Sequence, residues 1–228
     1  MQIEPIAVFH SPISGKFGVP RQAGLAEGLR GTVELMGKYR CPEALRGLED
    51  FDYLWLIWNF NLNDSADDGQ NSFRATVRPP RLGGNERIGV FASRSPFRPN
   101  ALGLSSVRIG TIDYDRCIIK VTGADLADGT PIFDIKPYVE YADSHPGVRS
   151  GFVDSKEWKP LEVFFDECPG TAVFSEEQKN ALAGILSLDP RPAYQNDPEK
   201  IYGLTFAGYD IHFKVRDDSA IVLDIQEK

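Results

Sequence analysis

The chain has 228 residues, a formal net charge of −8 and 42% hydrophobic residues, values typical of a soluble globular protein that forms one large domain or a domain with an appendage. Its three cysteines, Cys41, Cys117 and Cys168, are widely separated, which argues against a disulfide framework and fits a reducing compartment. The N-terminus does not show the pattern of a signal peptide, and the apolar run 53–58 is too short to span a bilayer, so we expect a cytoplasmic protein without membrane contact.

Alternating apolar residues predict strands through the first 150 residues. The segment DYDR, 113–116, predicts a hairpin turn, and PEALRGL, 42–48, predicts a short helix. Because strands follow one another through short connections, we expect a mainly β fold, a compact antiparallel β-barrel. The expected strands are 3–9, 31–35, 51–59, 87–92, 105–112, 117–123 and 133–137.

The pattern changes after about residue 150. The stretch ADSHPGVRSGFVDSK, 142–156, is typical of a linker. Beyond it we expect a strand in WKPLEVFFD, a helix in SEEQKNALAGILSLD with Ser175 and Gln178 as a capping box, and a hairpin about the DD of YDIHFKVRDDSAIVLDIQ. We therefore expect a β-barrel domain at 1–150 and a small α+β domain at 151–228.

The sequence motifs support neither a metal site nor a site that binds nucleotide phosphates. The histidines His10, His145 and His212 are scattered and no C-x-x-C pair occurs, so we expect no metal site. No G-x-G-x-x-G motif or P-loop follows a predicted strand, which argues against a dinucleotide-binding Rossmann domain and against an NTPase.

Positive charge is concentrated in one part of this acidic chain. Residues 74–98 contain six arginines, one acidic residue and no lysine, whereas 150–228 carry eight basic and fifteen acidic residues. A basic band on an acidic body predicts an anionic partner that docks at one place, although arginines can also simply solvate a surface loop. Pro96 and Pro99 restrict the backbone around Phe97-Arg98, which would pre-organise arginines for a bidentate grip on phosphate or carboxylate.

Four segments carry a resemblance to a known family: KFGVPRQAGL, RPPRLGGNERIGVFASRSPFRPNALGLS, DLADGTPIFDIKPY and DPRPAY, which begin at residues 16, 78, 125 and 189. Together they closely resemble the TsaA-like (TrmO) family of S-adenosylmethionine-dependent tRNA methyltransferases. The resemblance implies a non-Rossmann β-barrel that binds S-adenosylmethionine, and a homodimer. It also implies methylation of N6 of threonylcarbamoyladenosine, the modified purine next to the anticodon of tRNA.

The resemblance implies a donor pocket in which an arginine fork suits the donor carboxylate and Asp128 accepts from its ribose or ammonium. Gly129 would let the backbone approach the ligand closely. Related sequences often have His-Gln at positions 61–62, so only backbone contacts are carried over there. The implied donor residues are Pro20, Arg21, Gln22, Asn61, Leu62, Arg94, Leu104, Leu126, Ala127, Asp128 and Gly129.

N6, the nitrogen that would receive the methyl group, belongs to a urea whose carbonyl withdraws its lone pair. We therefore expect a base or a hydrogen-bond acceptor to assist the methyl transfer. Candidates are Asp134, Tyr138 and Tyr194, although Asp134 can instead pair with Lys136. Arg191 is expected to grip the threonine carboxylate, unless it only braces its loop with Asp189. The candidates for substrate contact are Phe97, Arg98, Lys136, Asp189, Arg191 and Tyr194.

Phe97 suits stacking on an unpaired base, but it can equally plug the barrel rim or a partner subunit. Three other functions stay open: a methyltransferase of the same fold with another substrate, a non-enzymatic module that binds S-adenosylmethionine or RNA, and a generic anion-binding barrel. The DPRPAY segment favours the tRNA-modifying branch.

Overall fold

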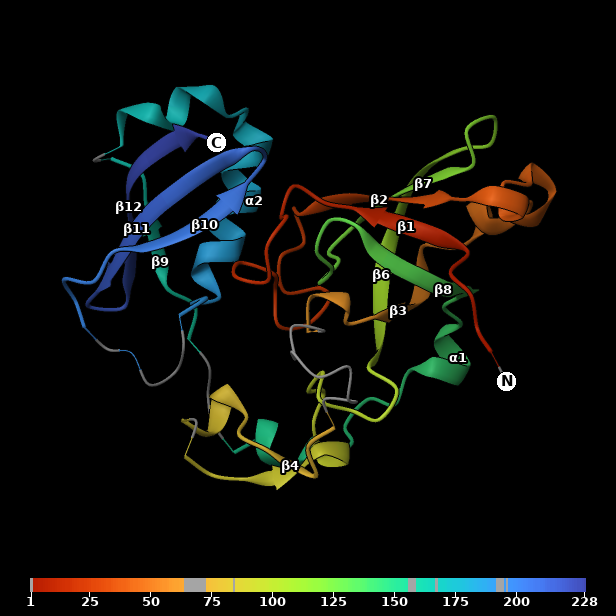
Figure 1. Ribbon diagram of the computed structural model, residues 1–228, viewed down its shortest axis with the longest axis horizontal. Helices are drawn as coiled ribbons and strands as arrows, with labels where there is room; N and C mark the ends of the chain where they lie inside the picture. The colour runs from red at the N-terminus through yellow and green to blue at the C-terminus, as the bar shows by residue number, and fades with distance from the viewer. Residues whose placement is uncertain are drawn as a thin grey trace.

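The architecture comes from a computed structural model, which describes residues 2–63, 73–83, 85–155, 159–166, 168–191, 195 and 197–228. Six strands close into a barrel in the order β1-β2-β7-β6-β3-β8 (Figure 1), and each neighbouring pair is antiparallel. The predicted mainly β fold with an antiparallel barrel is confirmed. The barrel strands are β1 (Ala7–His10), β2 (Arg30–Leu35), β3 (Tyr53–Asn59), β6 (Leu102–Asp113), β7 (Ile118–Thr122) and β8 (Thr130–Pro137).

The barrel interior is filled by alternate residues of these strands. On β3, Leu54, Leu56 and Trp58 are buried while the residues between them face outward. Trp58 lies across Gly103 of the paired strand β6, where a Cβ atom would come within 2.2 Å of the indole ring. Gly103 therefore makes room for the largest side chain inside the barrel.

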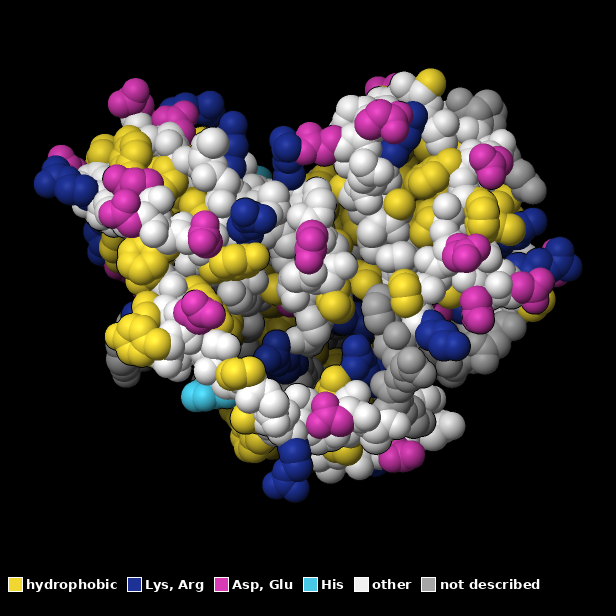
Figure 2. All heavy atoms as spheres, turned by 180° about the vertical axis from the view of Figure 1, so that it is seen from behind, with side chains coloured by type: hydrophobic (Ala, Val, Ile, Leu, Met, Phe, Trp, Pro, Cys, Tyr) yellow, Lys and Arg dark blue, Asp and Glu magenta, His cyan; other side chains and the backbone are white. Residues whose placement is uncertain are grey.

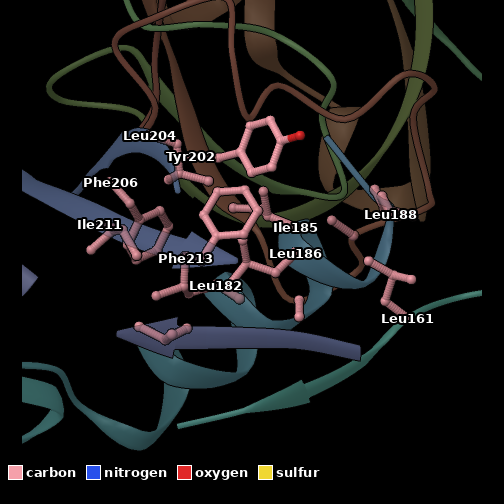
Figure 3. Packing of buried hydrophobic residues seen from close by; sticks show 14 of the residues in the cluster. Leu161, Leu182, Ile185, Leu186, Leu188, Tyr202, Leu204, Phe206, Ile211 and Phe213 are labelled. Carbon is pink, nitrogen blue, oxygen red and sulfur yellow. The ribbon is translucent and has the colours of Figure 1, made fainter. Parts of the chain in front are cut away.

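A second unit follows, built from one helix and a four-stranded sheet in the order β10-β11-β12-β9. Helix α2 (Glu176–Ser187) packs its apolar side chains against this sheet (Figure 3). The expected capping box is confirmed, because Ser175 and Gln178 exchange side chain to backbone hydrogen bonds. The strands are β9 (Glu162–Phe164), β10 (Tyr202–Phe206), β11 (Tyr209–Arg216) and β12 (Ser219–Glu227).

The expected hairpin is also present, since β11 and β12 pair through a turn in which Asp217 and Asp218 have φ values of 48° and 59°. Strand β10 was not predicted. Short connecting helices complete the described chain: α1 (Glu140–Asp143) and the 3₁₀ turns Gly37–Tyr39, Asn61–Asn63, Pro80–Leu82, Gly151–Val153 and Pro169–Val173.

Three predicted elements differ from the structure. The expected strand at 3–9 is shorter, because β1 begins only at Ala7. The expected helix at 42–48 is a pair of 3₁₀ turns, Pro42–Leu45 and Leu48–Asp50, because Gly47 between them adopts a left-handed φ of 84°. The expected strand at 87–92 shortens to β5 (Ile88–Gly89), which pairs with β4 (Thr76–Val77). In the part of the chain that the structure covers, no helix is both long and apolar enough to cross a membrane.

The loop 11–29, which connects β1 to β2, joins the barrel to the second unit. Ile13, Ala26 and Leu29 are buried in the same apolar cluster as α2 and the second sheet. The Phe17 ring stacks on Phe213 with centroids 6.5 Å apart. The second core is therefore completed by residues that lie far earlier in the sequence.

We expect Gly103→Ala to lower the free energy of unfolding by about 1–3 kcal/mol, because the new methyl group would overlap the Trp58 ring in a packed interior. Gly89→Ala is the matched control, since no described residue other than its chain neighbours comes within 4 Å of its Cβ position and its φ of −60° suits alanine. Chemical denaturation of both variants measures the difference. Equal stabilities would show that the barrel interior is loosely packed at Trp58.

Candidate functional site

Two of the segments implied to bind the donor meet at one end of the barrel. The amide of Gly24 donates to the Gly123 carbonyl at 2.8 Å, and the Ala23 backbone donates to the Asp125 carboxyl. Residues 20–24 and 123–129 therefore lie side by side although about a hundred residues separate them. We call these two segments, together with Arg94, the donor rim.

Arg94 reaches the donor rim from the arginine-rich loop. One of its guanidinium nitrogens donates to Gln22 Oε1 at 2.5 Å, and the residue is exposed. A guanidinium has five N–H donors, so this contact leaves further donors for a ligand carboxylate. Two residues that the resemblance implied for donor binding are thus in direct contact.

Asp125 belongs to the donor rim but was not among the predicted site residues. Its Oδ1 accepts a hydrogen bond from Ser105 Oγ, whose oxygen accepts one from the Trp58 indole at 2.9 Å. The Ala23 backbone also donates to Asp125. The carboxyl therefore ties the loop that carries Gln22 to the barrel interior.

Burial raises the pKa of Asp125 above the usual value for an aspartate, while the Ser105 hydrogen bond and the nearby Arg94 charge act in the opposite direction. The only signal for this residue in the sequence is its place at the start of the DLADG segment. The contact with Ser105 cannot be read from spacing, since it depends on how the barrel closes.

The other implied donor residues differ in what they can offer a ligand. Leu126 and Ala127 are buried, so only their backbone atoms can face a ligand, whereas Leu104 is 55% exposed on the barrel surface. Asp128 is exposed and accepts the Ser11 amide at 3.0 Å. Gly129 has a φ of 76° with no described atom within 4 Å of its Cβ position.

Apart from Arg21, the remaining implied donor residues are Pro20, Leu62 and Asn61. Pro20 is buried, whereas Leu62 is 39% exposed. Asn61 lies near the start of β8, where its Oδ1 is 3.5 Å from Thr130 Oγ1.

Arg21 points to the DPRPAY loop instead of the rest of the donor rim. Its guanidinium donates to the backbone carbonyls of Asp189 and Arg191, both at 3.1 Å. Although part of the residue stays exposed, loss of hydration lowers the pKa of Arg21; the Asp189 charge raises it, and the nearby Arg81 lowers it further. A loop of the barrel unit and a loop of the second unit thus hold each other.

Arg191 is already occupied within its own loop. Its guanidinium donates to both carboxylate oxygens of Asp189 at 2.7 and 2.8 Å, and this pairing raises the pKa of Arg191. This geometry favours the alternative in which the pair braces the loop. Tyr194, the third residue predicted here, lies outside the described residues.

The arginine-rich loop is held together by its own side chains. Arg98 donates to the carbonyls of Val90 and Ser93 at 3.1 and 2.8 Å, around the 3₁₀ turn Val90–Ala92. The Arg74 guanidinium lies 4.1 Å from the centre of the Phe97 ring. Arg98 therefore stabilises the loop, and one face of Phe97 is covered.

The remaining catalytic candidates are not brought to the donor rim of their own chain. Asp134 pairs with Lys136 at 2.8 Å on the barrel surface. This is the ion pair that the sequence offered as the alternative to a catalytic role. Tyr138 packs against Tyr53 and Trp55. At about 3.3 Å per strand residue, Asp134 and Tyr138 are at most roughly 17 and 30 Å from Gly129 along the extended chain. Within the described ranges, no group of three or more His, Cys, Asp or Glu side chains is arranged to hold a metal ion.

Comparison with known proteins places both parts of the chain in one family. The family model of the tRNA-methyltransferase O N-terminal domain matches residues 8–144, and that of the TrmO C-terminal domain matches 160–228. A tRNA (adenine(37)-N6)-methyltransferase of Escherichia coli K12 is 37% identical over 95% of this chain and 94% of its own length. A Pseudomonas aeruginosa protein that carries the name of an S-adenosylmethionine-dependent methyltransferase, RcsF, is 38% identical over 98% of this chain and 96% of its own.

A crystal structure of TrmO from Pseudomonas aeruginosa superimposes with a TM-score of 0.79 at 31% identity, covering 100% of this chain and 97% of that one. The fold defines a β-barrel protein with an exposed arginine, Arg94, at one end and an attached α+β unit. With both of its domains matched, the chain belongs to the tRNA-methyltransferase O family.

The raised pKa of Asp125 predicts a pH-dependent difference in stability between the wild type and Asp125→Asn. The folded state holds this proton more tightly than the unfolded chain. The resulting stability is fully present below the unfolded pKa, about 3.9, and is lost as pH rises through the folded pKa. The free energy of unfolding of the wild type, minus that of the variant, should therefore fall as pH rises from about 4 and then level off.

Denaturant titrations over a pH series measure this difference. Asp115→Asn in the exposed hairpin turn controls for the loss of one negative charge. A difference that stays constant with pH would show that Asp125 is no more protonated in the folded state than in the unfolded chain.

Proposed function

We propose that this chain transfers a methyl group from S-adenosylmethionine to N6 of adenosine 37 in tRNA. The observation that carries the proposal is the 37% identity to the Escherichia coli tRNA (adenine(37)-N6)-methyltransferase over nearly the full length of both chains. We also propose that the adenosine carries a threonylcarbamoyl group, that the protein is a homodimer, and that it is cytoplasmic. These finer points rest on the segment resemblance.

The donor rim, together with Leu104, offers groups that suit this donor. The exposed guanidinium of Arg94 can hold a carboxylate, and the exposed carboxylate of Asp128 can accept from an ammonium or a ribose hydroxyl. Leu104 offers exposed apolar surface for a purine, and the backbone at Gly129 is accessible because no described side chain covers it. When bound, S-adenosylmethionine supplies a methyl group activated by its sulfonium.

The contribution of this chain is mainly alignment. The hydrogen bonds of Asp125 to Ser105 and Ala23 fix the loop that carries Gln22, and Gln22 in turn holds Arg94. A rim fixed in this way can hold two reactants in line, which supplies much of the acceleration of a group transfer. In the proposed homodimer, Asp134 and Tyr138 are candidates only for the site of the second copy.

Mass spectrometry of nucleosides tests the activity directly. Incubation of the protein with S-adenosylmethionine and tRNA that carries threonylcarbamoyladenosine should add one methyl group to that nucleoside. Donor binding by calorimetry without any turnover would favour a binding module instead, and equal methylation of unmodified adenosine 37 would remove the threonylcarbamoyl requirement.

We expect Arg94→Ala to weaken donor binding about tenfold or more, because a charge-assisted hydrogen bond to a carboxylate contributes roughly 1.5–3 kcal/mol. Calorimetric titration with S-adenosylmethionine measures the change. Arg108→Ala, an exposed arginine on the same barrel strand as Leu104, is the matched control. Unchanged affinity in Arg94→Ala with an intact thermal transition would remove Arg94 from the donor site.

We also expect that methylation needs no added metal, since the motifs lack a set of metal ligands. Methyl transfer should then be unaffected by a chelator. Loss of activity that zinc or magnesium restores, with the tRNA still folded, would contradict this expectation.

A further inference from the structure

The first residues of the KFGVPRQ segment have no place in the donor rim, yet they form one wall of a cavity between the two units. The cavity has a volume of about 370 Å³. One wall is the segment 16–21, and the other consists of Ile185, Leu188 and Pro190 from the end of α2 and the loop that follows. This volume lies within the range of about 300–1,000 Å³ that small-molecule pockets occupy.

The polar side chains of this cavity are positively charged. Lys16 and Arg21 line it, and Arg81 lies close enough to lower the pKa of Arg21. The carboxylate of Asp189 is paired with Arg191. No described carboxylate lies within 4 Å of the charged groups of Lys16, Arg21 or Arg81. Figure 2 shows that Lys and Arg side chains gather around the hollow in the lower middle of that face.

The rest of the lining is apolar, including Phe17, Val19 and Leu188. A cavity with apolar walls and cations suits a ligand that has an uncharged body and an anionic group. Pro20 and Arg21 belong both to this cavity and to the residues implied for donor binding. Since the other donor-rim residues do not line the cavity, its ligand would lie beside the donor, where an acceptor belongs.

We propose that this cavity receives the carboxylate-bearing substituent of the modified adenosine, with Lys16 as the contact to the carboxylate. The inference rests on the proposed function. Lys16 is positioned for this role because its ammonium donates to Asn63 Oδ1. Arg191, the residue predicted for this contact, is instead engaged by Asp189. An RNA phosphate has similar anion chemistry, but a backbone phosphate would not need the apolar walls.

The test compares two synthetic anticodon stem-loops that differ only at position 37, one with adenosine and one with threonylcarbamoyladenosine. Wild-type protein, Lys16→Gln and Lys38→Gln are titrated with each RNA by fluorescence anisotropy at one fixed salt concentration. Lys38 is a matched control, since it is an exposed lysine paired with Glu4 outside this cavity. Thermal unfolding and donor calorimetry establish that each variant is folded and binds S-adenosylmethionine.

Wild-type protein should bind the modified RNA more tightly. Lys16→Gln should lose about tenfold in affinity for the modified RNA, as expected for one charge-assisted hydrogen bond, and little for the unmodified RNA. Lys38→Gln should behave as wild type. An equal loss of affinity for both RNAs would assign Lys16 to a phosphate and overturn the proposal. The proposal would also be overturned if Lys16→Gln lost no affinity for either RNA, or if the wild-type protein bound both RNAs equally well.

Methylation of the same RNAs separates this inference from the proposed function. If wild-type protein methylates the modified RNA while Lys16→Gln keeps its preference, only the inference about the cavity is wrong. If wild-type protein methylates neither RNA, the proposed function fails independently of Lys16.

Discussion

The packing of the loop 11–29 into the second core is the constraint on which the rest of the structure depends. Ile13 and Leu29 are almost completely buried there, and burial of such a side chain contributes about 1.5–3 kcal/mol. A surface ion pair such as Arg30–Glu177 contributes only about 0–1 kcal/mol. Apolar packing therefore sets the position of the loop, and the loop carries Lys16, Arg21 and Gln22 to their places.

The barrel holds the same loop from the other side through polar contacts. A carboxyl withdrawn from water, such as that of Asp125, is costly to ionise, and Ser105, Ala23 and Arg94 offset part of that cost. The loop is thus fixed by apolar contacts on one side and by a hydrogen-bonded carboxyl on the other. Contacts on both sides therefore restrict the movement of this loop.

Individual strands and helix α2 could be predicted because their sequence signals are local. The alternation in YLWLIWN produces strand β3, and Ser175 with Gln178 defines the start of α2 within four residues. Strand β10 escaped prediction because YGLTF is short and contains a glycine, so only pairing with β11 makes it a strand.

The site was harder to predict than the fold because its contacts are long-range. Resemblance indicated Gln22 and Arg94, but no spacing rule links Asp125 to Ser105 or Arg21 to the carbonyl of Asp189. For Arg191 and Asp134, the simpler alternative of an ion pair within the same segment is what the structure shows. Short ion pairs between neighbours form readily, and they satisfy charges that would otherwise be free for a substrate.

The shared loop also bears on how this protein can change over evolution. Residues 11–29 precede most of the barrel in the chain, yet Ile13, Ala26 and Leu29 complete the interior of the unit at the other end. A recombination event that exchanged only the C-terminal unit would separate these three residues from the rest of the hydrophobic core that they complete. In this chain, substitutions on α2 are therefore constrained by a loop that lies about 150 residues earlier.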